Sequence, residues 1–437
     1  MRKRLLRRSM AAVGLYSSVV LGFLGTAVAA RTFSRELFGL FTLVVVATGF
    51  SQMLLDLTVE EALVKYGIRY STRADWGRLR GLFRGGLVLK LAGGLLGGLG
   101  LLVLAPFADS LFGAHGATKA LLVAAALPVV QSVEGLAGAV LFVRNRYDIR
   151  SALLAVSTGL RFAGIVVGVR FGLVQTVVGI VVAQAVATAT VGGVALAAFR
   201  RFPSASARPL GEDRSEVVRF VLQSSAATGV LSLRGALSPL LLGIATSTVQ
   251  MGYFKVAQAP QQGFNALSAP ARMILLTEQT HDWERGRQSA VLRGVRRYSL
   301  AAAALMAAAL PPLLWFMPDL IRLVYSAKYL GATDASRVLA VAAAVVFVVG
   351  WTKSFPVTIG RPNLRIWTHG LEALIVLPLV GVLGAAYGAT GAAIALLAGT
   401  CAFALAWVLI FLRVRPDDSV PEPLGGVIAE EIEAAAL

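Results

Sequence analysis

The chain has 437 residues, of which 57% are hydrophobic and 15% are charged, and its mean hydropathy is +0.74. An ordinary soluble domain carries about 25% charged residues, so this composition excludes a water-soluble function and indicates a protein that crosses a membrane many times. The single cysteine, Cys401, excludes a disulfide framework, and the formal net charge is +18.

Apolar stretches of about 20 residues, the length that crosses a hydrocarbon core of about 30 Å, recur along the whole chain. Backbone groups in lipid must be hydrogen-bonded within the segment, and no alternating strand pattern occurs, so we expect these stretches to be helices. The fold class is therefore an all-α polytopic membrane protein with about 12 transmembrane helices. The predicted spans are 10–30, 37–59, 86–107, 120–142, 152–172, 174–198, 217–244, 249–275, 298–317, 335–354, 366–386 and 390–412.

The basic residues are concentrated in alternate loops between these spans. With the N-terminus inside, most of the 41 lysines and arginines fall in cytoplasmic segments, as the positive-inside rule requires. We therefore predict a multi-pass protein of the cell (inner) membrane with both termini cytoplasmic. Since this topology explains the net charge, we predict no nucleic-acid partner.

The two halves of the sequence resemble one another at an offset of about 213 residues. Phe38-Gly39-Leu40-Phe41 opens the second span, and Met251-Gly252-Tyr253-Phe254 opens the eighth. Each half holds six predicted helices, an even number, so the two repeats are parallel. Such architectures place the substrate between the halves.

These repeats divide the chain into four parts. We predict an N-terminal six-helix lobe at 1–200, a cytoplasmic linker at 201–216 and a C-terminal six-helix lobe at 217–415. The remaining segment, 416–437, is acidic and is predicted to be a disordered cytoplasmic tail.

Several ionisable side chains fall inside predicted spans, where a charge costs about 2.5–3.5 kcal/mol at the helix centre and tends to face a cavity. The cationic candidates for substrate binding are Arg234, Lys255, Arg161 and Lys90. The acidic ones, Glu134 and Glu372, are candidates for ion coupling or for charge partners. Lys90 and Glu372 lie close enough to the cytoplasmic face to snorkel instead, and Glu134 is equally well explained as a structural partner of an arginine.

The eighth predicted helix has a polar face. Lys255, Gln258, Gln262 and Asn265 follow one another at helical spacing, with Gln261 beside them. At 100° per residue they occupy one side of the helix, which we expect to line a water-filled cavity rather than to face lipid.

A cationic cavity indicates an anionic substrate, because guanidinium and ammonium groups bind phosphate through charge-assisted hydrogen bonds. Amide side chains suit hydroxyl-bearing groups such as sugars, so the combination points to a lipid-linked glycan. The sequence has no Walker-type phosphate loop and no histidine paired with a nucleophile, and we predict neither enzymatic activity nor a cofactor or metal.

Four segments resemble the polysaccharide (O-antigen-type) flippases of the multidrug/oligosaccharidyl-lipid/polysaccharide (MOP) exporter superfamily. They are similar to the opening of that family's second helix, to its seventh-to-eighth junction, to the entry to its tenth helix and to the turn between its last two helices. The segments are Ala30 to Phe41, Leu240 to Phe254, Tyr325 to Leu339 and Tyr387 to Ala393.

The resemblance implies a V-shaped pair of lobes that move an undecaprenyl-pyrophosphate-linked oligosaccharide, a polysaccharide repeat unit, from the cytoplasmic to the external leaflet. It also implies that Arg234 and Lys255 face the pyrophosphate, with membrane lipid, a polysaccharide polymerase and glycosyltransferases of the same pathway as partners. Many relatives carry an acidic residue beside the basic one on the seventh helix, where this chain has Gly235.

Two other functions remain open at this stage. A multidrug/cation antiporter of the related multidrug branch would need an acidic or aromatic cavity. A non-transporting scaffold of a glycan-assembly complex would pair its buried charges structurally.

Overall fold

The computed structural model describes residues 2–55, 59–113, 115–264, 279, 282–283, 287–359, 361 and 363–414. Every regular element among these residues is a helix, which confirms the all-α class. The predicted cavity residue Asn265 and the predicted tail at 416–437 lie outside the described residues.

The first half of the chain supplies six long helical segments, as predicted, one of which consists of α5 and α6 in direct succession. It also supplies one shorter helix, α3, that was not predicted. α3 lies between the second and third predicted spans and is too polar to count as a span. The elements are α1 (Arg2–Thr32), α2 (Arg35–Leu55), α3 (Val59–Thr72), α4 (Trp76–Leu111), α5 (Ala117–Ala124), α6 (Ala126–Val143), α7 (Tyr147–Gly168) and α8 (Leu173–Arg200).

The second half follows the same plan with more interruptions. Its first helix begins at Asp213, inside the predicted linker. The elements are α9 (Asp213–Ala245), α10 (Thr248–Ala257), α12 (Gln288–Trp315), α13 (Met317–Tyr325), η1 (Ala327–Ala332), α14 (Thr333–Val348), η2 (Gly350–Lys353), α15 (Phe355–Thr358) and α16 (Asn363–Arg413).

Eight segments of the described chain are long and apolar enough to cross a membrane. One of them, α16, contains the last two predicted spans, which meet at Gly388. Gly388 has φ +58° and ψ −137°, and any Cβ there would collide with the Gln250 amide, so only glycine fits this turn. The Gln250 carbonyl also accepts a hydrogen bond of 2.9 Å from the Ala389 N–H.

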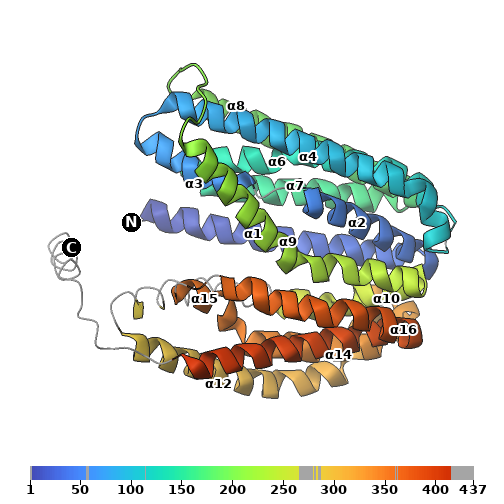
Figure 1. Cartoon of the computed structure of the whole chain (residues 1–437). Coiled ribbons are helices and arrows are strands. Elements are labelled where there is room, and N and C mark those ends of the chain that lie inside the picture. Colours follow the sequence, from blue (N-terminus) through green and yellow to red (C-terminus); the bar gives the residue numbers. More distant parts are fainter. Residues whose placement is uncertain are drawn as a thin grey trace.

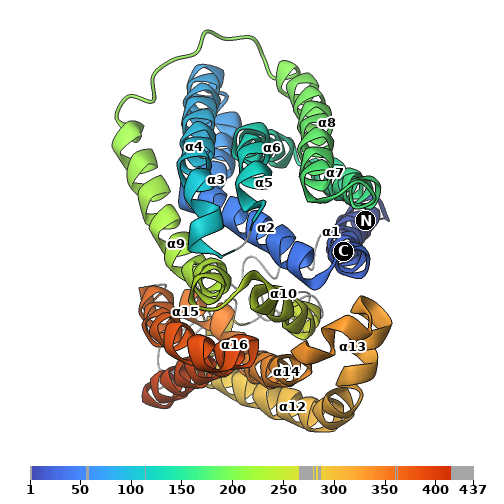
Figure 2. The same ribbon diagram turned by 90° about the vertical axis from the view of Figure 1, so that its right-hand side faces the viewer.

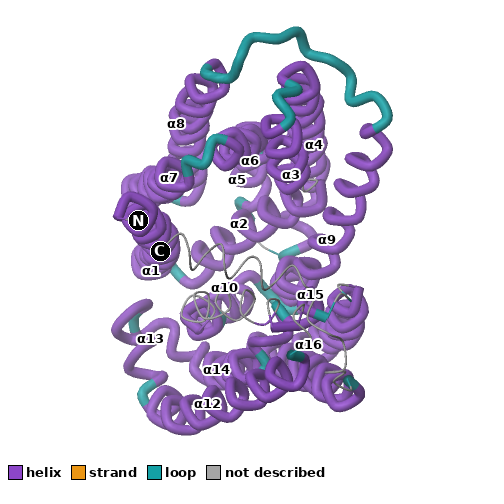
Figure 3. The backbone as a smooth tube through the Cα atoms, turned by 90° about the vertical axis from the view of Figure 1, so that its left-hand side faces the viewer, coloured by secondary structure: helices purple, strands orange, loops and turns teal. Residues whose placement is uncertain are grey.

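The helices form two groups that the sequence halves largely define. α1 to α8 lie together in the upper part of Figure 1, and α12, α14 and α16 lie together below them. Figures 2 and 3 show the same two groups from opposite ends, with α2 and α10 adjacent between them. We call these groups the first lobe and the second lobe. α9 packs on α16 of the second lobe but also touches α2 and α3 of the first.

The backbones of α2 and α10 approach each other closely at the duplicated glycines. A Cβ on Gly39 would overlap the Thr248 carbonyl, and one on Gly252 would lie 3.5 Å from the Gly39 backbone. Small residues allow helices in a membrane to pack at this separation, where dispersion rather than the hydrophobic effect drives association. The repeat seen in the sequence therefore marks the contact between the lobes.

This contact belongs to the end of the molecule that holds the α1–α2 and α9–α10 turns, which we call the far end. There the Arg31 guanidinium donates to the carbonyls of Leu323 and Val324, the second at 2.8 Å. In return the Lys328 ammonium donates to the carbonyls of Arg31, at 2.8 Å, and Phe33. Cationic side chains thus cap backbone carbonyls across the lobe boundary.

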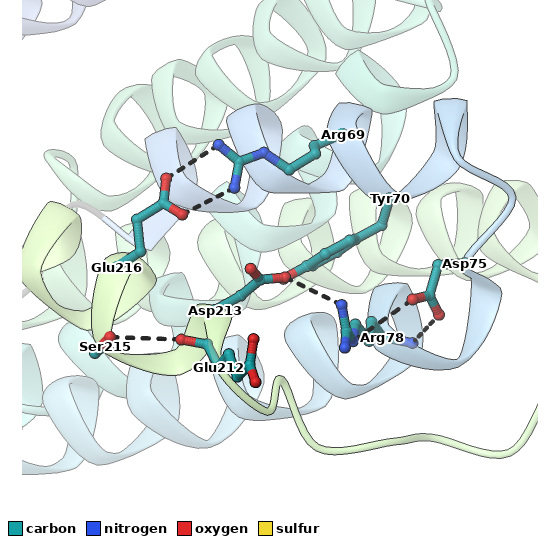
Figure 4. Close-up of polar contacts among 8 residues, drawn as sticks. All are labelled: Arg69, Tyr70, Asp75, Arg78, Glu212, Asp213, Ser215 and Glu216. Atoms are coloured by element: carbon teal, nitrogen blue, oxygen red, sulfur yellow. Dashed lines mark hydrogen bonds and ion pairs between the residues drawn. The ribbon is translucent and has the colours of Figure 1, made fainter.

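The opposite end, which we call the linker end, holds residues 201–212 and the start of α9. Figure 4 shows how the first turn of α9 is fixed to α3 and α4. Glu216 accepts two parallel hydrogen bonds of 3.0 Å from Arg69, and Asp213 accepts one of 2.9 Å from the Tyr70 hydroxyl and pairs with Arg78 at 3.3 Å. α9 therefore starts on the first lobe and continues along the second.

Candidate functional site

A cavity of about 340 Å³ lies inside the first lobe. Its wall comes from α1, α2, α6, α7 and α8, and Lys255 of α10 reaches it from the second lobe. The polar and charged side chains on this wall are Thr26, Thr42, Thr48, Gln52, Gln131, Thr158, Arg161, Gln184 and Lys255.

The helical period places the α2 contribution on one face. Thr42, Val45, Thr48 and Gln52 follow at three- and four-residue steps and therefore lie on one side of the helix, and the neighbouring Phe41, Val44 and Gly49 also line the cavity. The Gln52 amide donates a 3.0 Å hydrogen bond to the carbonyl oxygen of Gln131 on α6. The two amides join α2 and α6 across the cavity wall.

Arg161 on α7 is held beside a buried carboxylate. Its Nη2 lies 3.5 Å from Oε2 of Glu134, whose side chain is 8% exposed. The same oxygen accepts a 2.8 Å hydrogen bond from Nε2 of Gln184 on α8. The structure thus joins the predicted Arg161 and Glu134, and it adds Gln184, which the sequence analysis did not select.

Lys255 is the second cation on this wall. Among the residues that the structure describes, its ammonium has no carboxylate within ion-pairing distance. Glu134 neutralises Arg161 but not Lys255. The side chains of the cavity wall, taken together with Glu134, therefore carry a net positive charge. A desolvated ammonium is costly at membrane depth, so the cavity must supply water or an anion to Lys255.

Arg234 is not on the cavity wall. Its Nη1 pairs with Oε1 of Glu372 on α16, and Oε2 of the same carboxylate lies 3.1 Å from Nδ1 of His369. The carboxylate is 3% exposed, and the His369 ring stacks on Phe403 with centroids 4.7 Å apart. We call Arg234, Glu372 and His369 the second-lobe cluster.

The remaining predicted residues lie apart from both places. Lys90 on α4 is buried and pairs with Glu60 of α3 at 3.2 Å. Gln258, Gln261 and Gln262 follow the end of α10 and are partly buried or exposed, and none of them is on the cavity wall.

The interrupted eighth helix explains why the predicted polar face is not continuous. α10 ends at Ala257, Gln258 is in a turn, and the chain is helical again from 259 to 264. Pro260 has no N–H to donate to the Val256 carbonyl, so the regular helix stops there. The angular phase that aligned Lys255 with the glutamines assumed an unbroken helix.

Three amides that line the cavity were missed, namely Gln52, Gln131 and Gln184. The signal was present, because each is an amide inside a predicted apolar span. No spacing within one helix groups them, since they come from α2, α6 and α8.

No protein-family model and no curated protein matches the sequence. Solved structures match the fold over almost the whole chain. Lipid II flippase MurJ in an inward closed conformation superposes with a TM-score of 0.70 at 13% identity, covering 93% of this chain and 88% of MurJ. An inward-facing multidrug resistance MATE family transporter of the MOP superfamily superposes with a TM-score of 0.73 at 15% identity, covering 92% and 97%. A MOP superfamily transporter from Pyrococcus furiosus Vc1 gives 0.61 at 14% identity, covering 92% and 93%.

At these identities the likeness shows the fold. The chain has the two-lobe fold of these transporters, which confirms the predicted all-α architecture of two lobes. An outward-facing MATE transporter superposes with a TM-score of 0.60, against 0.73 for the inward-facing one.

Proposed function

We propose that this chain is a flippase that moves an undecaprenyl-pyrophosphate-linked oligosaccharide from the cytoplasmic to the external leaflet by alternating access between its two lobes. The observation that carries the proposal is the cationic first-lobe cavity, whose wall holds Lys255 and Arg161, with Glu134 paired to Arg161. Phosphate oxygens match the Lys255 ammonium, and their binding there would offset the cost of this unpaired charge.

The arrangement of the lobes supports a direction for this movement. In our proposal the linker end is cytoplasmic in a cell (inner) membrane, because it holds most of the basic loop residues. The far end, where Arg31 and Lys328 bridge the lobes, would then be external and closed. The basic residues near the linker end are Arg69, Arg73, Arg78, Arg80, Arg84, Arg144, Arg146, Arg150, Arg200, Arg201, Arg208, Arg214 and Arg219.

The partners follow from the substrate. A lipid-linked repeat unit must be assembled by glycosyltransferases before it is moved, and a polymerase must use it afterwards. We propose both as pathway partners, with membrane lipid around the transporter and no nucleic acid.

The proposal is tested with the purified chain in proteoliposomes that contain a fluorescent undecaprenyl-pyrophosphate-linked oligosaccharide. Loss of one hydrogen bond to a charged group weakens binding by about 10- to 100-fold. We expect Lys255→Ala to lower the initial flipping rate by that factor, measured as protection of the fluorophore from an impermeant quencher. Lys255→Arg keeps the charge and should retain most of the rate.

Arg170→Ala is the matched control, because Arg170 is exposed just beyond the end of α7 and is not on the cavity wall. It should flip substrate like the wild type. No flipping by the wild-type chain, with intact insertion, would refute the proposal, and a normal rate in Lys255→Ala would refute the role of Lys255.

Cation antiport is the second candidate function. It is supported by the superposition on MATE transporters and by the buried carboxylates Glu134 and Glu372, which could exchange a proton for a cation. The cationic surplus of the cavity opposes it. Efflux of a cationic dye from the same proteoliposomes, without flipping of the lipid-linked oligosaccharide, would reverse the order of the two proposals. If the proteoliposomes show neither dye efflux nor flipping, the result would favour a non-transporting scaffold.

A further inference from the structure

Three buried polar atoms on the first-lobe cavity have no hydrogen-bond partner. They are Oγ1 of Thr42, Nε of Arg161 and Oε1 of Gln184, three of the nine such atoms found among the described residues. Thr42 and Gln184 are 2% and 0% exposed. The three residues line the cavity, while these particular atoms are covered by their neighbours. Buried polar groups in native structures are almost always paired, so we expect a ligand in the cavity to draw the three side chains toward it and pair these atoms.

The orientation of the Gln184 amide is fixed by its neighbours. Its Nε2 donates to Oε2 of Glu134 at 2.8 Å and to Oγ1 of Thr188 at 2.9 Å, which uses both amide hydrogens. The same Glu134 oxygen lies beside the Arg161 guanidinium and accepts from it, so the amide places its Nε2 donor, and not its oxygen, toward Glu134. Oε1 is therefore left as an acceptor without a donor.

Arg161 presents the complementary group beside it. Its Nη2 approaches the same Glu134 oxygen that Gln184 binds, so the two side chains are neighbours. Its unpaired Nε is a donor, whereas the unpaired Gln184 Oε1 is an acceptor, and the Thr42 hydroxyl can act as either. A ligand that satisfies all three atoms must both donate and accept.

This requirement separates the classes of ligand. A phosphate dianion offers acceptors only, so it leaves the Gln184 oxygen unpaired. An ammonium cation offers donors only and is repelled by Arg161. Sugar hydroxyl and acetamido groups donate and accept, and they match the three atoms.

The size of the cavity limits how much of a glycan it accepts. At about 340 Å³ it lies near the lower limit of small-molecule sites, which range from about 300 to 1,000 Å³. That volume suits one sugar ring and its phosphate rather than an oligosaccharide. The Gln52–Gln131 amide pair adds polar groups to the same wall.

We propose that Thr42, Arg161 and Gln184 form a subsite for the sugar ring that is attached directly to the phosphate, with Lys255 binding the phosphate. This inference rests on the proposed function and deepens it, because it assigns the substrate's first sugar to the first lobe. Because different residues bind the sugar and the phosphate, variants can change the affinity for one without changing the affinity for the other.

A matched pair of soluble ligands tests the subsite in the full-length purified chain. One ligand is geranyl pyrophosphate, and the other is geranyl pyrophosphate esterified to a sugar, prepared with glucose, galactose and N-acetylglucosamine. The quantity measured is the ratio of the two dissociation constants. We expect the wild type to bind at least one sugar-bearing ligand about tenfold more tightly than the sugar-free ligand.

Thr42→Val removes the unpaired hydroxyl and keeps the shape of the side chain. It should reduce the sugar preference by about five- to tenfold, the value of one or two hydrogen bonds, and leave the thermal midpoint unchanged or raised. Gln184→Met should also reduce the preference. Lys255→Ala should weaken both ligands equally and leave the ratio unchanged, since it acts on the phosphate.

The outcomes distinguish this inference from the proposed function. Equal binding of sugar-bearing and sugar-free ligands across the panel, or an unchanged ratio in Thr42→Val, would overturn the subsite and leave water as the partner of the three atoms. If flipping of the lipid-linked oligosaccharide is intact in the same preparation, the proposed function survives that result. A sugar preference that Thr42→Val removes, without any flipping, would support the subsite and refute the flippase.

Discussion

The first-lobe cavity is lined by Arg161 and, from α10, by Lys255, whereas in the second lobe Arg234 is paired with Glu372, which also contacts His369. Each lobe contains a buried carboxylate, Glu134 in the first and Glu372 in the second. The first lobe leaves hydrogen-bonding groups unused on a cavity wall, and the second uses both oxygens of its carboxylate. A buried charge therefore does not by itself identify a binding site. Buried polar groups that lack hydrogen-bond partners beside a cavity are the better indication.

The largest expected effect is in the second-lobe cluster. Glu372→Ala leaves the Arg234 guanidinium without its carboxylate in a place where water has little access. Breaking a buried pair by removing one partner costs about 3–5 kcal/mol. We expect a large fall in the thermal unfolding midpoint of the purified protein.

The double variant Arg234→Ala with Glu372→Ala is the control, because it removes both charges. It should recover most of the lost stability. If the double variant unfolds as early as Glu372→Ala, the cluster is not a mutually dependent ion pair.

The equivalent change in the first lobe, Glu134→Ala, should lower the free energy of unfolding by less. Glu134→Ala leaves Arg161, whose side chain is 34% exposed, beside a cavity where water can replace the carboxylate. Leaving a buried group unsatisfied costs about 1–3 kcal/mol, and cavity water reduces the cost further. The same thermal measurement checks this, and a loss equal to that of Glu372→Ala would remove the contrast between the lobes.

The smallest effect is expected at the linker end, outside the spans, where α9 is fixed to the first lobe. Burial and the hydrogen bond to Asp213 raise the pKa of Tyr70 from 10.0 to about 12. The raised pKa means that folding favours the protonated phenol, so its contribution is complete below pH 10 and is lost as the pH rises toward 12. Tyr70→Phe should make the free energy of unfolding less dependent on pH in that window. Its pH dependence near neutrality should be unchanged.

Stability measured between pH 9 and pH 12 provides the check. Tyr16→Phe serves as the control, because it removes a phenol from α1, away from this network. Parallel decline of the wild type and Tyr70→Phe would show that the Tyr70–Asp213 contact contributes nothing to holding α9.

The sequence predicted the scaffold well and the site in part. Hydropathy located the spans because each must match the thickness of the bilayer by itself, and the Gly39 and Gly252 repeat marked the contact between the lobes. The sequence also predicted that Arg234 and Lys255 share one cavity, and the structure places them apart. They lie only 21 positions apart, but one pairs with α16 and the other faces α1, α2 and α7. Such partners come from distant helices, which no local spacing encodes.

The first-lobe cavity itself was beyond sequence reasoning for the same reason. Gln52, Gln131 and Gln184 come from three helices, and Pro260 interrupted the helix on which the polar face had been predicted. Only the assembled bundle shows which amides share a wall.

The most direct test of the account compares a single cysteine in each lobe, in a Cys401→Ser background. Thr158→Cys lies on the cavity wall, and Ser238→Cys replaces a buried hydroxyl that donates to the Arg234 carbonyl. The account predicts that an impermeant thiol reagent labels Thr158→Cys, that lipid-linked oligosaccharide slows this labelling, and that Ser238→Cys stays unlabelled. Labelling and substrate protection at Ser238→Cys, with Thr158→Cys unreactive, would contradict it.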